Sequence, residues 1–160
     1  HLGSYTACTG RTEVLFEQNG VVYVDDYAHH PSEIRTSLEE LNERYPRHKI
    51  LVIFCPHTAS RTRAFSEDFA RELSKCDALI VQATYASARG DGPSGPDPAQ
   101  HLARQVSSLT STTCAFAQDE DTALALASLW LQERWLCITM GAGNNRSLCE
   151  RIAHQRRSLS

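Results

Sequence analysis

The sequence predicts an α/β fold: a doubly wound, mostly parallel sheet of about six strands, with helices on both faces and one antiparallel edge strand. Three observations lead to this prediction. Short apolar segments alternate with helical ones along the chain, as in repeated strand–helix–strand units. The apolar segments are nearly continuous rather than alternating with polar residues, as in strands that are buried on both faces. Finally, Asn19-Gly20 is a two-residue hairpin signal that places an antiparallel strand before the first parallel one.

The expected strands are short and rich in strand-forming residues. They are Glu13–Phe16, Val21–Asp25, Lys49–Cys55, Ala78–Gln82, Thr112–Phe116 and Leu136–Thr139. The helices between them carry apolar residues at helical spacing, such as Ile34, Leu38, Leu41 and Tyr45, and Phe65, Phe69 and Leu73. Their start signals are Pro31, Asp97 followed by Pro98, and Asp119 before an Ala/Leu-rich helix that ends near Trp130.

The composition excludes several classes of protein. A chain of 160 residues suits one core, and we expect residues 1–160 to form a single domain. The net charge is −3 and the apolar runs are short, so we expect no nucleic-acid binding and no membrane insertion. No basic-then-apolar leader is read at the start, so we expect no secretory signal. The six cysteines contain no C-x-x-C pair, which favours buried free thiols, a cytoplasmic location and no zinc site.

Ligands of doubly wound, Rossmann-like sheets bind beyond the carboxyl ends of the strands. Polar residues interrupt the apolar segments at four such places, which are Asp25–Pro31, Pro56–Arg63, Thr84–Arg89 and Gly141–Asn145. The candidate functional residues are therefore expected in these four segments.

The first segment reads Asp25-Asp26-Tyr27-Ala28-His29-His30-Pro31. Carboxylates at a strand end can accept hydrogen bonds from a ribose or hold a hydrated magnesium ion, and an aromatic ring beside them can stack on a base. For an acidic pair alone, a turn before a capped helix is the commoner interpretation. The whole string is more specific, because it resembles the D-D-Y-A/G-H-H-P signature of the Mur ligases that join alanine to UDP-muramate.

The second segment reads Pro56-His57-Thr58-Ala59-Ser60-Arg61-Thr62-Arg63. A guanidinium fork matches a carboxylate, so its arginines can hold an amino-acid carboxylate. Two arginines that merely open a solvated helix are the alternative. The string resembles P-H-R-Y/F-S/T-R-T-R of the same family, which favours a binding role for His57 and Arg61.

Weaker likenesses to this family follow in order from about Tyr5 to Ile152. Tyr5–Glu13 resembles the entry to the family's C-terminal domain and places Arg11 on an arginine that reaches the ATP phosphates. Thr84–Arg89 resembles Y-A-A-G-E, and Met140–Asn145 resembles M-G-A-G-D. These likenesses support the family by position, because a Gly-rich turn also serves tight strand–helix packing.

The resemblance implies that this chain is the C-terminal domain of a three-domain ligase, whose partners are its own central and N-terminal domains. The ligase would join L-alanine to UDP-N-acetylmuramate through an acyl phosphate in peptidoglycan synthesis, with ATP and Mg²⁺. The phosphate loop and the magnesium ligands belong to the central domain, and no G-x-x-x-x-G-K-S/T is found here. The implied ATP-binding residues are Arg11, Asp26, Tyr27 and His30, and the implied amino-acid-binding residues are His57, Arg61, Arg63 and Arg89. No catalytic residue and no metal ligand is assigned to this chain.

Four positions depart from the family pattern. Thr58 stands where the family has an arginine, Gly10 replaces the first of two paired arginines, Arg89 replaces a glutamate, and Asn144 replaces an aspartate. Our hypothesis is that Arg89 supplies, from a neighbouring loop, the guanidinium that Thr58 lacks.

Other functions remain as alternatives. A receiver-type signalling module would need an aspartate after Ala78–Gln82 and a lysine after the last strand, and both are absent. A metal site built from His29, His30 and His57 is disfavoured, because adjacent histidines rarely bind one ion. The peptide-recycling ligase that attaches a whole peptide to UDP-muramate, and a nucleotide-binding relative without catalysis, stay open.

Overall fold

The computed structural model describes residues 12–85, 95–143 and 145–159. The strands are β1 (Thr12–Gln18), β2 (Val21–Asp26), β3 (Lys49–Cys55), β4 (Ala78–Gln82), β5 (Thr113–Ala117) and β6 (Trp135–Gly141). They form one sheet in the order β1-β2-β6-β3-β4-β5. Only the β1–β2 pair is antiparallel, and β2, β6, β3, β4 and β5 run parallel. The predicted sheet is therefore confirmed: β3 and β4 have the expected bounds, and the ends of the other strands differ from the expected ones by at most two residues.

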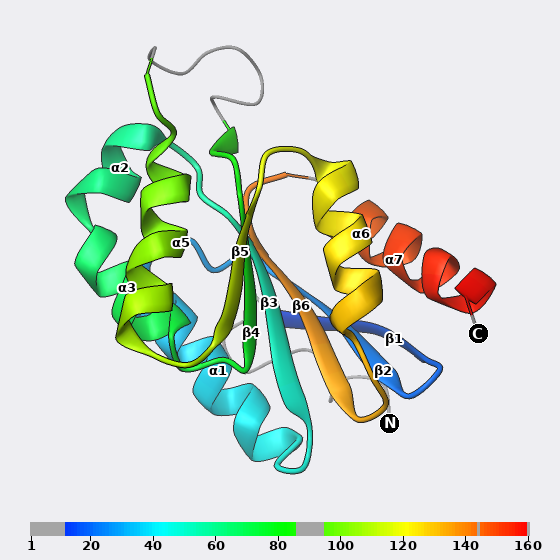
Figure 1. Ribbon diagram of the computed structural model, residues 1–160. Helices are drawn as coiled ribbons and strands as arrows, with labels where there is room; N and C mark the ends of the chain where they lie inside the picture. Colours follow the sequence, from blue (N-terminus) through cyan, green and yellow to red (C-terminus); the bar gives the residue numbers. More distant parts are fainter. Residues whose placement is uncertain (1–11, 86–94, 144, 160) are drawn as a thin grey trace.

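Helices cover both faces of this sheet, as the doubly wound prediction requires (Figure 1). They are α1 (Pro31–Arg44), α2 (Ala59–Ala64), α3 (Ser66–Leu73), α5 (Pro98–Leu109), α6 (Glu120–Trp130) and α7 (Asn145–Leu159). The first four lie on one face, and α6 and α7 lie on the other. The chain changes faces after β5, and β6 then enters the sheet between β2 and β3.

The predicted helix starts are also confirmed. Pro31 and Pro98 open their helices, where the missing N–H of proline costs no hydrogen bond. Asp97 accepts a hydrogen bond from the Ala99 N–H at 3.0 Å, and Asp119 accepts one from the Thr122 N–H at 2.8 Å. These side chains bind N–H groups that the helix itself leaves without a partner.

The β1–β2 hairpin turns at Asn19 and Gly20, with φ values of 52° and 79°. Both values lie in the left-handed region, which the two-residue turn requires and which Asn and Gly tolerate best. The turn pairs Gln18 with Val21, so the hairpin signal in the sequence is confirmed.

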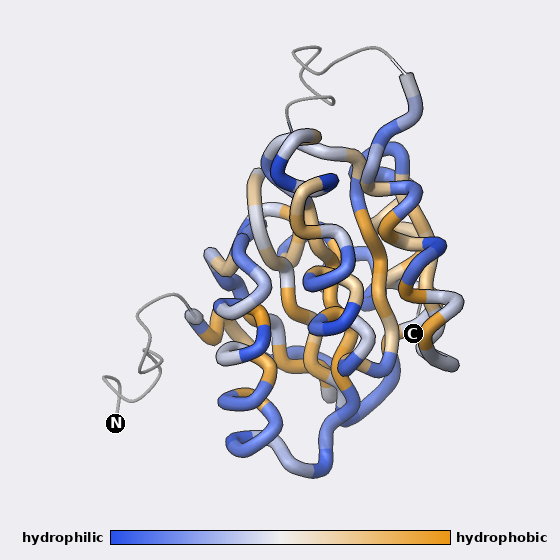
Figure 2. Tube along the Cα trace, turned by 90° about the vertical axis from the view of Figure 1, so that its left-hand side faces the viewer, coloured by the Kyte–Doolittle hydropathy of each residue, from blue (hydrophilic) through white to orange (hydrophobic). Residues whose placement is uncertain are grey.

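The strands divide the core into two apolar layers (Figure 2). Successive residues of a strand point to opposite faces. In β2, Val22 and Val24 pack under the face covered by α1, α3 and α5, whereas Val21 and Tyr23 pack under α6 and α7. Burial on both faces explains why the strands have continuous apolar sequences.

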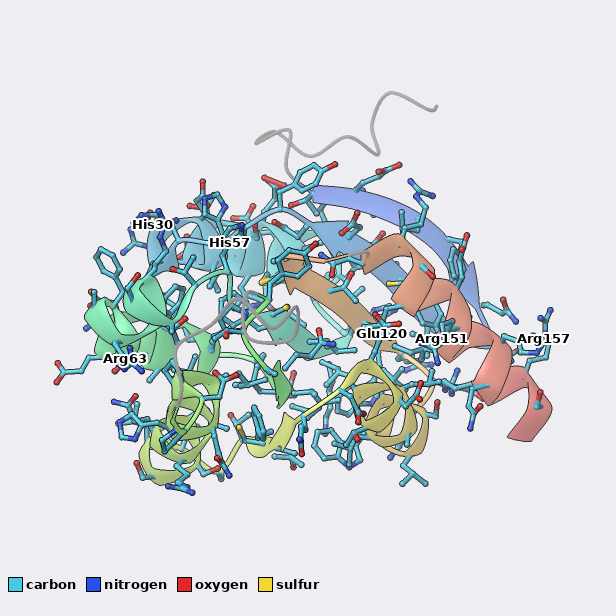
Figure 3. All side chains as sticks on the ribbon, turned by 90° about the horizontal axis from the view of Figure 1, so that it is seen from above. His30, His57, Arg63, Glu120, Arg151 and Arg157 are labelled. Carbon is cyan, nitrogen blue, oxygen red and sulfur yellow. The ribbon has the colours of Figure 1, made fainter. Side chains whose placement is uncertain are left out.

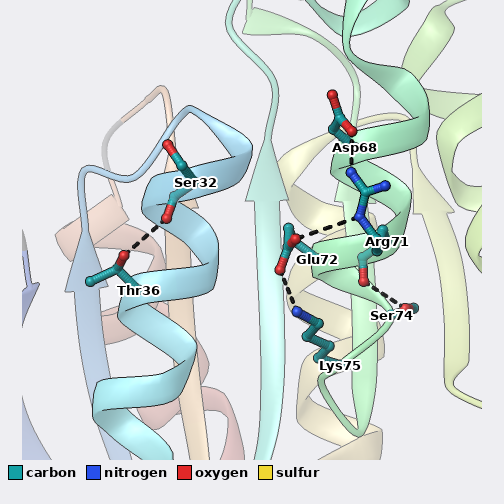
Figure 4. Close-up of polar contacts among 7 residues, drawn as sticks. All are labelled: Ser32, Thr36, Asp68, Arg71, Glu72, Ser74 and Lys75. Atoms are coloured by element: carbon teal, nitrogen blue, oxygen red, sulfur yellow. Dashed lines mark hydrogen bonds and ion pairs between the residues drawn. The ribbon is translucent and has the colours of Figure 1, made fainter.

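The C-terminal part of α3 carries a small charge network around a buried carboxylate (Figure 4). Glu72 is only 6 % exposed, and it lies 2.6 Å from the Lys75 ammonium and 3.7 Å from the Arg71 guanidinium. Arg71 also pairs with Asp68. The network compensates the buried Glu72 carboxylate, which would otherwise destabilise the helix.

Five cysteines lie in the described part of the chain and all are free. Cys55, Cys76, Cys137 and Cys149 are buried and Cys114 is half-buried, which confirms the predicted role as small apolar residues. Cys8 lies outside the described residues. Among the described helices, none combines the length and the apolar character needed to cross a bilayer.

Candidate functional site

The four polar segments meet at one edge of the sheet, because β2, β6, β3 and β4 are parallel and end there. Backbone hydrogen bonds tie the loops together. The Ala142 N–H donates to the Cys55 carbonyl at 3.0 Å, and the Tyr85 N–H donates to the Pro56 carbonyl at 2.8 Å. The described residues of the four segments therefore lie together at the carboxyl edge, as expected, and a ligand site at this edge stays a prediction.

Asp26 does not face solvent at this edge, contrary to expectation. Its side chain is 0 % exposed. One carboxylate oxygen accepts from the Thr12 hydroxyl at 2.5 Å and the other accepts from the Ala28 N–H at 2.7 Å. The reason is strand alternation, which places Asp26 on the same face as Val22 and Val24, under α1. Asp26 holds the turn that leads into α1, and in this structure it offers no oxygen to a ligand.

The rest of this turn presents two rings to solvent. Glu33 accepts hydrogen bonds from the backbone N–H groups of His29 (3.1 Å) and His30 (3.2 Å), which fixes the start of α1. The His30 ring packs against Phe65, with ring centroids 5.2 Å apart. Tyr27 is 66 % exposed, and its ring is free to stack on a flat ligand. Tyr27, and the half-buried His30 beside it, are therefore better placed than Asp26 to touch a nucleotide.

The loop after β3 explains the unusual Thr58. Thr58 is the N-cap of α2, and its side-chain oxygen accepts from the Arg61 N–H at 3.3 Å. Its carbonyl accepts from both the N–H and the hydroxyl of Thr62, at 3.1 and 2.6 Å. Thr58 thus serves the helix instead of a ligand, while His57 beside it is exposed.

Arg61 and Arg63 project from different sides of α2, because residues two apart on a helix do not share a face. Arg61 is half-buried and Arg63 is exposed. In the view onto the carboxyl edge, His30 and His57 lie near each other, whereas Arg63 lies apart on the outer side of α2 (Figure 3). Arg63 therefore lies apart from His57, and Arg61 stays the predicted partner of His57.

A pocket of about 190 Å³ opens where β3, β4 and β6 end, on the α6 and α7 side. It is lined by Cys55, Gln82, Ala83, Tyr85, Gln118, Asp119, Glu120, Ala142, Gly143, Asn145 and Leu148. The Tyr85 ring forms one wall and lies 6.1 Å from the His57 ring. Sequence reasoning identified the Thr84–Arg89 segment but did not single out Tyr85, because the sequence does not show where the side chain of an aromatic residue in a loop points.

Asp25 is a second residue that sequence reasoning did not assign. It is half-buried beside the start of α7, and one of its carboxylate oxygens is buried without a hydrogen-bond partner among the described residues. Burial raises the pKa of Asp25 above its ordinary value of 3.8, and the nearby Glu13 raises it further, while Asn145 and Arg146 oppose the shift. Asp25 is therefore an acidic group whose burial is only partly compensated by Asn145 and Arg146.

Asp25→Asn is expected to stabilise the protein at neutral pH, because the folded state disfavours the charged carboxylate. An acid with a raised folded pKa binds more protons in the folded state, so stability falls as pH rises above 3.8 toward the folded value. Asparagine removes that loss. The difference in melting temperature between variant and parent should grow from acidic to neutral pH.

Asp119→Asn is the matched comparison. Hydrogen bonds from Thr122 lower the pKa of Asp119, so its stabilising contribution is present above 3.8 and is lost as pH falls through the lowered value. The two asparagine variants should therefore show opposite pH trends. An increase in melting temperature for Asp25→Asn that does not vary with pH would refute the idea that the folded state disfavours the charged Asp25 carboxylate.

Several sequence-assigned positions lie outside the described residues. These are Arg11, Arg89, Gly10 and Asn144. Within the described ranges, no group of three or more His, Cys, Asp or Glu side chains is arranged to hold a metal ion. The exposed Tyr27 ring fits a stacked base, whereas the buried Asp26 carboxylate does not fit direct contact with a ribose.

Comparison with known proteins shows the family to which this chain is similar. Residues 10–143 match the family model for the Mur ligase, glutamate ligase domain. The chain is similar to the UDP-N-acetylmuramate–L-alanine ligase of Borreliella burgdorferi, at 38 % identity over 143 residues that cover 89 % of the chain and 30 % of the relative. It is 34 % identical to the ligase of the same name from Treponema pallidum, over 93 % of the chain and 31 % of the relative. The chain thus spans about a third of the length of these relatives.

Solved structures share the fold. A UDP-N-acetylmuramate–alanine ligase from Thermotoga maritima superposes with a TM-score of 0.72 at 23 % identity, over 92 % of this chain and 30 % of that one. A murein peptide ligase from Psychrobacter arcticus gives a TM-score of 0.71 at 14 % identity, over 89 % of this chain and 28 % of that one. At these identities the likeness establishes the architecture alone.

Proposed function

This chain belongs to the Mur ligase family, as a C-terminal domain of the peptidoglycan ligases, and on that premise we propose that it serves the addition of L-alanine to UDP-N-acetylmuramate. One observation carries the proposal. The two strings that resemble the alanine-adding ligases follow β2 and β3, the strands on either side of β6, and both lie at the carboxyl edge, where the His30 ring contacts Phe65. The remaining domains of such an enzyme would supply the UDP-muramate site, the phosphate loop and Mg²⁺, in the cytoplasm.

The proposed acceptor site uses His57 and Arg61. A guanidinium and an imidazole on one loop can hold the α-carboxylate of alanine and leave its amine free. Holding the amine next to an acyl phosphate replaces a bimolecular encounter, which contributes about 7–11 kcal/mol in ideal intramolecular cases. Thr58 contributes through the helix cap, and Arg89 remains our candidate for the second guanidinium.

The proposed nucleotide side uses Tyr27 and His30, with Arg11 toward the phosphates. ATP, when bound with Mg²⁺, supplies the phosphoryl group that activates the muramate carboxylate. The chain's own residues stack on the base and neutralise charge. Asp26 supports this side indirectly by fixing the turn that carries Tyr27.

Arg61→Ala, made in the ligase that contains this chain, is expected to raise the KM for alanine by roughly 10- to 100-fold. This is the size of one lost charge-assisted hydrogen bond of about 1.5–3 kcal/mol. The KM for ATP should change little. Arg63→Ala is the comparison on the opposite side of α2, and equal effects of the two variants would contradict the proposed pocket.

The 160-residue chain alone is expected neither to hydrolyse ATP nor to form the amide bond, because it contains no phosphate loop. Purified chain is incubated with ATP, Mg²⁺, L-alanine and UDP-N-acetylmuramate, and phosphate release is followed. Grafting the chain in place of the matching part of the Borreliella burgdorferi ligase should restore alanine-dependent phosphate release. An active isolated chain, or a folded graft that uses another amino acid instead, would overturn the proposal.

A further inference from the structure

The two edges of the sheet differ in how they are protected. β1 forms one edge, and it carries a bulge between Val14 and Phe16 and the exposed Glu13 and Glu17. Bulges and charged side chains are the usual devices that prevent an edge strand from pairing with another chain. β5 forms the other edge, and Thr113–Ala117 contains no charge, no proline and no break in its pairing with β4.

The open backbone groups of β5 can be identified. The Ala117 carbonyl accepts from the Ala83 N–H at 3.0 Å, so Ala117 points its backbone groups toward β4. Backbone groups alternate in direction along a strand. Cys114 and Phe116 therefore present their N–H and C=O groups to the open side, in two matched positions separated by Ala115.

Apolar surface flanks this open edge. A groove of about 460 Å³ runs between β5 and α5, lined by Ala103, Arg104, Ser107, Cys114, Ala115 and Phe116 among others. Leu109 at the end of α5 is 61 % exposed, and Leu129 near the end of α6 is 74 % exposed. α5 and α6 lie on either side of β5 (Figure 1), and each of them carries one of these exposed leucines.

We propose that β5 is a self-association surface, at which two copies of this chain pair their β5 strands antiparallel about a two-fold axis through Ala115. This register sets Cys114 opposite Phe116 of the partner subunit, and all four outward pairs of backbone groups are matched. A strand without charge is compatible with itself in this arrangement, because no like charges meet. The two sheets would become one continuous sheet, and the apolar groove beside α5 would be covered.

Charges of opposite sign, introduced at Ala115 on the two-fold axis, test whether the partner is a second copy of the chain. In a two-fold pair, Ala115→Lys sets two ammonium groups against each other, and Ala115→Glu sets two carboxylates against each other. Each variant alone is expected to weaken self-association at least tenfold in sedimentation velocity, run from micromolar to millimolar concentration. An equimolar mixture should form a heterodimer at least as strong as the parent dimer. Recovery in the mixture also shows that the variants are folded.

Gln155→Lys adds the same charge at an exposed position of α7, far from β5, and it should associate like the parent. Ala115→Cys tests the register, because the two residues form a pair without mutual hydrogen bonds, whose Cα atoms are about 4.5 Å apart and within disulfide reach. Oxidised glutathione should link two Ala115→Cys chains but not two parent chains. A parent chain that is monomeric at every concentration, or a mixture that does not associate, overturns the proposal.

Discussion

Gly141→Ala is expected to destabilise the protein by about 3–5 kcal/mol, the range of severe core and backbone substitutions. Gly141 has a φ of +93°, and a Cβ placed there would lie 2.3 Å from the Cys55 carbonyl oxygen. That carbonyl also accepts from the Ala142 N–H, so it cannot move away without breaking the bond that joins the ends of β3 and β6. The residue therefore combines an unfavourable backbone conformation with a clash against backbone.

Gly143→Ala is the matched control for this prediction. Its φ of +97° imposes nearly the same conformational cost, but a Cβ there would meet only Tyr85, at 4.0 Å. The difference between the two variants in urea denaturation isolates the clash. If both alanine variants lose the same stability, then backbone conformation alone makes Gly141 necessary.

Asp26→Ala is expected to cost about 3–4 kcal/mol, since it removes two hydrogen bonds to a carboxylate and leaves their buried donors unpaired. The Thr12 hydroxyl and the Ala28 N–H would both lose their acceptor. For a domain of this size, the melting temperature should fall by roughly 10 °C. Activity of the whole ligase should also fall, because the turn that carries Tyr27 loses its anchor.

Two further substitutions separate support of the fold from contact with a ligand. Asp26→Asn keeps the acceptor for the Ala28 N–H, and Thr12→Val removes the hydroxyl from the other side. If Asp26 acts through the turn, the two changes should be non-additive in stability, and nucleotide affinity should follow the folded fraction. A stable Asp26→Ala variant with weak ATP binding would instead support direct contact between Asp26 and ATP.

The fold could be predicted from local signals because each element carries its own. Asn19-Gly20 determined the hairpin, Pro31 and Pro98 marked helix starts, and the apolar strands showed burial on two faces. The order of the strands could not be predicted in this way, because no local signal indicates that β6 lies between β2 and β3. Pairing between distant segments depends on the whole packed core.

The candidate site could be located from sequence but not oriented. The carboxyl-edge rule found all four loops, but it could not show which of Asp25 and Asp26 faces the site, and only Asp26 was assigned, through the family resemblance. Alternation along β2 sends Asp26 under α1 and Asp25 toward α7, and only the structure shows which side is already occupied. From the sequence, Thr58 was interpreted as the loss of an arginine from a binding motif. Its role as the N-cap of α2 can be recognised only when the backbone of the helix is known.

The position of β6 has a consequence for synthesis on the ribosome. β2 and β3 do not pair with each other, and each pairs with β6, which is made more than eighty residues after β3 begins (Lys49 to Trp135). A nascent chain that stops before Trp135 therefore contains two separate parts of the sheet, the β1–β2 hairpin and the β3–β4–β5 strands. The strand position between them is empty. Pairing between such distant strands slows folding, and the edges of β2 and β3 stay exposed until β6 has been synthesised. We therefore expect chaperones to bind the nascent domain until then.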